Sequence, residues 1–80
     1  MTPRARRRAI GYVLLATAQV QQREIEQACS TGLKAAGLLH GLRSNRGAEY
    51  LEDLQQRLEP YREEPVVREF GARMELQAAA

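Results

Sequence analysis

Residues 48–60 read AEYLEDLQQRLEP, which is the pattern of an amphipathic helix followed by a proline. Leu51, Leu54 and Leu58 recur at spacings of three and four residues, so a helix places them on one face. Pro60 has no backbone N–H and cannot continue the helix. We therefore expect a helix over residues 48–59, and it is the clearest element in the chain.

Another helix, the last in the chain, is predicted to begin at Pro65, because proline suits the first helical position. Its apolar stripe is formed by Val66, Val67, Phe70 and Met74, with Leu76 beyond them. Acid-to-arginine pairs four residues apart recur through both C-terminal helices, which indicates solvated faces. We expect a turn over residues 60–64 and a loose tail at residues 77–80.

Upstream of residue 48, the polar stretch RSNRG at residues 43–47 predicts a loop. A helix is predicted before it, over residues 33–42. Within it Gly37 and Gly41 lie four residues apart, a spacing that would let another backbone approach closely. Residues 30–32, Ser-Thr-Gly, predict a break that separates this helix from the preceding one.

The first helix is predicted over residues 3–29, and the basic arm at residues 1–8 is expected to project from the domain or to fray. Four arginines lie in this arm, and no acidic residue occurs before Glu24. We expect one apolar stripe along this helix, formed by Ile10, Leu14, Ala18, Gln21, Ile25 and Cys29.

Composition extends these local patterns to the whole chain. Good helix formers make up 52 of the 80 residues, whereas Val, Ile and Thr together number nine. We predict an all-α fold, a single domain of three or four helices over residues 1–80. Its core should be thin, because 12 of its 35 apolar residues are alanines.

The N-terminal segment has four interpretations. A basic start, the apolar run at residues 10–18 and Ala16-Thr17-Ala18 match a secretory signal, and the arginines also suit a mitochondrial presequence. The run has about half of the roughly 20 residues needed to cross a bilayer. We adopt the fourth interpretation, a solvated arm before a core helix. A single cysteine suits a reducing compartment, and we expect a cytoplasmic protein without a membrane partner.

Catalysis, cofactors and metals find no support in the sequence. Cys29 and His40 are a conceivable nucleophile and base, but no orienting group or oxyanion motif accompanies them. The glycines do not follow phosphate-loop spacing. We expect a chain that is not an enzyme and that binds no cofactor, metal or small-molecule substrate.

Two binding functions remain, and the first is a helical adaptor or regulatory protein that docks onto another protein or onto itself. Two amphipathic C-terminal helices meet a thin core, so their stripes are expected to be only partly covered. Phe70 is the best anchor among them, since it is the only Phe. The candidate docking residues are Leu51, Leu54, Leu58, Val67, Phe70 and Met74.

The alternative is a small basic DNA-binding regulator. Residues 1–43 carry seven bases and two acids, whereas residues 44–80 carry five bases and eight acids. Residues 24–42 have the outline of a helix-turn-helix with its turn at Gly32, although the second helix presents few side chains that read bases. The candidate phosphate contacts are Arg4, Arg6, Arg7, Arg8, Lys34, Arg43 and Arg46.

Overall fold

The computed structural model describes residues 3–42 and 45–79. In these ranges the chain forms helices α1 (Pro3–Gln21), α2 (Ile25–Leu42), α3 (Asn45–Leu58) and α4 (Pro65–Ala79), with a short 3₁₀ turn η1 (Glu59–Tyr61) after α3. No strand occurs in this part of the chain, so the predicted all-α fold is confirmed. The arginines of the arm belong to the first turns of α1, and residues 77–79 belong to the last turn of α4.

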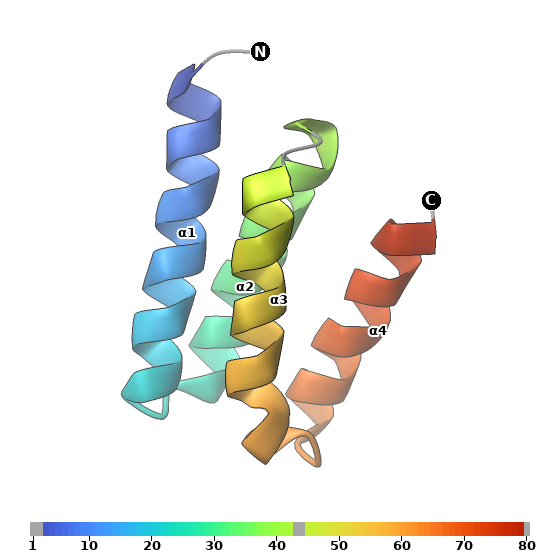
Figure 1. Cartoon of the computed structure of the whole chain (residues 1–80). Helices are drawn as coiled ribbons and strands as arrows, with labels where there is room; N and C mark the ends of the chain where they lie inside the picture. The colour runs from blue at the N-terminus through green and yellow to red at the C-terminus, as the bar shows by residue number, and fades with distance from the viewer. Residues whose placement is uncertain (1–2, 43–44, 80) are drawn as a thin grey trace.

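The helices run alternately down and up (Figure 1), and α2 packs against each of the other three. Its most extensive contact is with α1, followed by those with α4 and α3. In Figure 1, α1 and α4 form opposite edges of the molecule, and α4 leans away from α3 toward its C-terminal end. The outer sides of α1 and α4 are therefore not covered by another helix.

The core differs between the two ends of the chain. Phe70 and Leu54 are the largest fully buried side chains, and both belong to the C-terminal half. α1 and α2 contribute mainly small side chains to the same core, including four fully buried alanines: Ala9, Ala16, Ala28 and Ala35.

The predicted break at residues 30–32 is wrong, because α2 is continuous from Ile25 to Leu42. The chain turns earlier, at Gln22–Glu24. The Glu24 N–H donates to the Gln19 carbonyl at 2.8 Å, and the Arg23 N–H donates to the Val20 carbonyl at 2.9 Å, which is a Schellman ending. Arg23 takes the left-handed conformation, with φ 64°, where glycine is usual.

Gly32 has a packing role in the middle of α2. A Cβ at this position would lie 2.9 Å from Leu54 Cδ2 and 2.9 Å from Phe70 Cε1, closer than side chains pack. The absence of a side chain at Gly32 therefore lets α3 and α4 approach α2 at one point. By contrast, a Cβ at Gly37 would meet nothing within 4 Å, so the predicted close approach at Gly37 is wrong. The surroundings of Gly41 lie outside the described residues.

In the C-terminal half, the predicted turns lie closer to the turns of the structure than the predicted break at residues 30–32 does. α3 begins at Asn45, inside the predicted loop, and the first part of that loop, residues 43–44, is not described. Gly47 lies in the first turn of α3, where a Cβ would overlap the Leu39 side chain of α2. The expected turn at residues 60–64 is confirmed, since η1 follows α3 and α4 begins at Pro65.

Candidate functional site

The apolar face of α1 is arranged with its small side chains inward. Its buried residues are Ala9, Val13, Ala16 and Val20, spaced at four, three and four positions. These side chains let α1 lie close to α2, which explains why this pair has the most extensive contact in the molecule.

Larger apolar side chains of the same helix point outward. Leu14 is 55% exposed and Leu15 is 49% exposed. Gly11 is also exposed, and a Cβ at this position would meet nothing within 4 Å. Together with the half-buried Ala18, these residues follow the spacing of one helix face, and we call them the outer strip of α1.

The outer strip differs from the stripe expected for this helix. That prediction placed Leu14 with Ile25 and Cys29 on one inward face, but α1 ends at Gln21, so Ile25 and Cys29 belong to α2. Leu14 points to solvent and Ile10 is only half-buried. The physical reason is that residues 9–20 are apolar on nearly every side, so periodicity alone does not identify the inward face.

A basic end adjoins the outer strip. Arg4, Arg7 and Arg8 are exposed in the first turns of α1. Arg8 Nη2 lies 3.5 Å from the Tyr12 hydroxyl, and its guanidinium carbon is 5.8 Å from the Tyr12 ring centroid. The hydrogen bond from Arg8, together with its positive charge, lowers the pKa of Tyr12.

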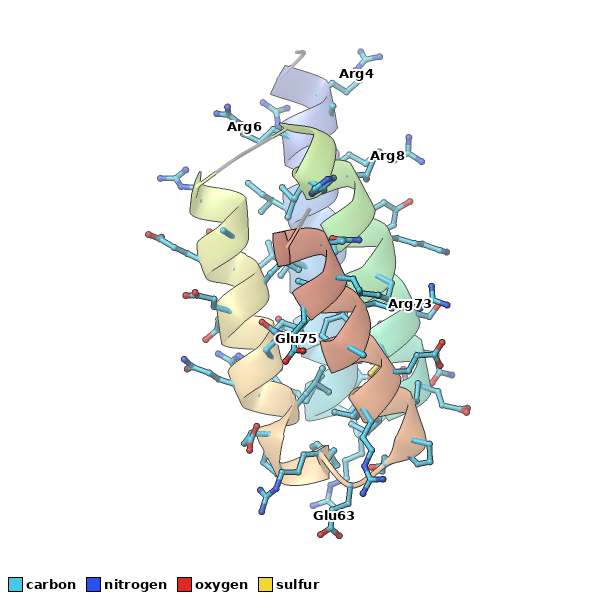
Figure 2. All side chains as sticks on the ribbon, turned by 90° about the vertical axis from the view of Figure 1, so that its right-hand side faces the viewer. Arg4, Arg6, Arg8, Glu63, Arg73 and Glu75 are labelled. Carbon is cyan, nitrogen blue, oxygen red and sulfur yellow. The ribbon has the colours of Figure 1, made fainter. Side chains whose placement is uncertain are left out.

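The arginines fan out around this end of α1. Figure 2 shows Arg4 and Arg8 pointing to one side of the helix and Arg6 to the other. Of the other predicted phosphate contacts, Lys34 is exposed on α2 and Arg46 is exposed in the first turn of α3, while Arg43 lies outside the described residues. The predicted helix-turn-helix is wrong, because residues 25–42 form one uninterrupted helix.

The predicted docking residues lie mostly in the core. Met74 is half-buried on α4, and the other five are buried: Leu51, Leu54, Leu58, Val67 and Phe70. The expectation that these two stripes are only partly covered is therefore wrong, because they meet at α2, where Leu54 and Phe70 pack over Gly32. On α4 the exposed large apolar side chain is Leu76, at 71%.

Cys29 and His40 do not form a catalytic pair. Both lie on α2 and are eleven positions apart, which corresponds to roughly 16 Å along a helix. Cys29 is buried, and this burial, followed by the negative charge of Glu64, raises the pKa of its thiol to about 11. A protonated, buried thiol is a poor nucleophile. Within residues 3–42 and 45–79, no cluster of three or more metal-ligating side chains occurs.

None of the described helices combines the length and the apolar character that crossing a membrane requires. The chain matches no protein-family model, no curated protein and no solved structure.

Proposed function

We propose that this chain acts by binding another protein, and that the outer strip of α1 is its docking surface. The observation that carries the proposal is the exposure of Leu14 and Leu15 on a helix that buries alanine and valine instead. A chain with few large apolar residues loses stability by leaving two adjacent leucines in water, and contiguous apolar surface of this kind marks interaction sites.

The geometry of α1 supports helix docking in particular. Its outer residues follow the i, i+3, i+4, i+7 spacing by which an amphipathic helix meets a partner helix or groove. Gly11 and Ala18 flank the two leucines and are small, so a partner backbone can approach on either side of them. The Phe70 region is the alternative anchor, but a partner would reach it only after α4 moved away from α2.

Photo-crosslinking inside the source cells tests this proposal. A photoreactive amino acid at Leu15 should give a defined crosslinked protein adduct, because the side chain lies at the centre of the docking surface. The matched control is the same photoreactive amino acid at Leu76, which is more exposed but lies on α4. Adducts that form equally at both positions, or at neither, would contradict the proposal.

DNA binding is the second candidate, and the cluster of exposed arginines at the start of α1 favours it. Without a helix-turn-helix, such binding would rest on phosphate contacts and would be independent of base sequence. A gel-shift titration at low salt tests it. Arg6→Ala/Arg7→Ala/Arg8→Ala should then weaken binding to all duplexes alike, and the absence of any shifted band for the unmodified chain would exclude DNA.

A further inference from the structure

We propose that the partner of the outer strip is a second copy of this chain, and that the two α1 helices pair antiparallel about a twofold axis. This inference rests on the proposed function, because it names the occupant of the same docking surface. Its basis is the self-complementarity of the strip and the charge distribution along the molecule.

The outer strip is self-complementary when it is reversed. With the twofold axis between Leu14 and Leu15, Leu14 of each copy faces Leu15 of the other, and Gly11 faces Ala18. The central leucines then pack together, and a small residue meets a small residue on each side. An isologous interface requires this match, since the same patch must serve both subunits.

Charge favours the antiparallel arrangement over the parallel one. Figure 2 shows Arg4, Arg6 and Arg8 at one end of the molecule and Glu63 at the opposite end. The turn at the far end of α1 carries the exposed residues Arg23 and Glu24.

Glu26 is exposed in the first turn of α2. This end of α1 therefore carries two carboxylates, Glu24 and Glu26, and one guanidinium, Arg23, so its net charge is negative. Antiparallel pairing places the basic end of each copy beside the acidic end of the other, and it does so twice. Parallel pairing would bring the two arginine clusters together, and like charges in contact oppose association.

The size of the surface sets the expected strength. α1 has 19 residues, and one pair of helices this long forms an interface near or below the lower limit of about 1,200 Å² for stable complexes. We therefore expect a reversible dimer that dissociates on dilution. Its affinity should fall as salt rises, because the Arg and Glu side chains involved are exposed.

Sedimentation velocity of the purified chain tests whether a second copy of the chain binds to the outer strip. Between about 10 µM and 1 mM, the apparent mass should rise from 9.0 kDa toward twice that value. Leu14→Gln/Leu15→Gln should weaken the dimer at least tenfold while circular dichroism remains unchanged, since both side chains are exposed. Leu76→Gln is the matched control and should leave the dimer intact. A chain that stays monomeric at 1 mM would overturn the inference.

Disulfide trapping tests the orientation. A Gly11→Cys copy mixed with an Ala18→Cys copy should form mixed disulfides at least tenfold faster than Gly11→Cys forms them with itself. The native Cys29 can remain, because it is buried. Preferred pairing between two Gly11→Cys copies would indicate parallel helices and would overturn the inference.

Two outcomes separate this inference from the proposed function. If the Leu15 photo-adduct contains a different protein while the purified chain stays monomeric, the docking surface holds and the second copy is wrong. If a monomeric chain instead sediments with vesicles of phosphatidylcholine and phosphatidylglycerol, and does so through Leu14 and Leu15, the strip is a lipid-binding face and both proposals fail.

Discussion

The two halves of the chain place their large apolar side chains differently: the C-terminal helices bury them, whereas α1 exposes two of them. α3 and α4 direct their large side chains, Leu54, Leu58 and Phe70, into the core. α1 directs alanines and valines inward and exposes Leu14 and Leu15. The C-terminal half therefore supplies much of the buried large apolar surface, while the N-terminal half supplies close helix contact and keeps apolar surface outside. The largest buried side chains and the proposed docking surface therefore lie on different helices.

The largest expected effect tests the C-terminal half. Phe70 is 2% exposed and packs over Gly32, so Phe70→Ala should lower the free energy of unfolding by about 3–5 kcal/mol. That loss is comparable to the whole stability of many small domains. Urea unfolding followed by circular dichroism measures it. Leu76→Ala, at an exposed position of the same helix, should change stability by less than about 0.5 kcal/mol.

If Phe70→Ala unfolds with nearly the same free energy as the unmodified chain, α4 contributes little to the core. The division of roles between the two halves would then be wrong, and α4 would become a candidate for the docking element.

The second prediction tests whether the part of the core around Cys29 on α2 is closed to water. Burial raises the pKa of the Cys29 thiol to about 11. At pH 8 this thiol is therefore about 100-fold less ionised than a thiol with the ordinary pKa of 9.0. Its reaction with a disulfide reagent should be slower in the native protein than in urea by at least that factor. Leu76→Cys adds an exposed thiol as an internal control, and it should react rapidly.

The same group sets a pH dependence. The Cys29 thiol keeps its proton to a higher pH in the folded state than in the unfolded chain. Its contribution to the free energy of unfolding is therefore fully present below about pH 9. The contribution of Cys29 to the free energy of unfolding should fall as pH rises from about 9 toward 11. Cys29→Ala should lose this contribution, and an identical pH profile for both proteins would contradict the burial of the thiol.

The third prediction compares two glycines of α2. Gly32→Ala should destabilise the fold by about 1–2 kcal/mol, because the added Cβ overlaps Leu54 and Phe70. Gly37→Ala should stabilise it by up to about 1 kcal/mol, since alanine favours helix and its Cβ meets nothing within 4 Å. Thermal unfolding of the two variants measures both effects, and equal shifts for the pair would refute the packing role of Gly32.

These glycines also show what the sequence could and could not reveal. The helices of the C-terminal half were predictable because their apolar residues occupy one face and prolines mark their boundaries. The boundary between α1 and α2 was not predictable. Gly32 resembles a turn residue in the sequence, but in the structure it makes room for Leu54 and Phe70. The actual turn contains Arg23 in the left-handed conformation, which glycine adopts more readily.

The candidate site was harder to predict than the fold. Apolar residues occur around nearly the whole circumference of α1 over residues 9–20, so periodicity could not distinguish the face that packs on α2 from the outer strip. One signal was available: a solvated helix face is normally polar, and the adjacent residues Leu14 and Leu15 cannot both lie at the centre of one buried stripe. The sequence therefore implied exposed apolar surface on this helix without locating it.

The smallest expected effect concerns the turn that joins the two helices of the N-terminal half. A non-glycine residue in the left-handed region costs about 1–2 kcal/mol, and glycine removes that cost while adding about 0.5–1 kcal/mol of unfolded-state entropy. Arg23→Gly should therefore stabilise the fold by about 0.5 kcal/mol. Arg23→Ala keeps the unfavourable φ of 64° and removes only the charge, so it should change stability less. Thermal unfolding of the two variants separates conformation from charge, and equal stabilisation by glycine and by alanine would show that the Arg23 charge, rather than the backbone conformation, limits this turn.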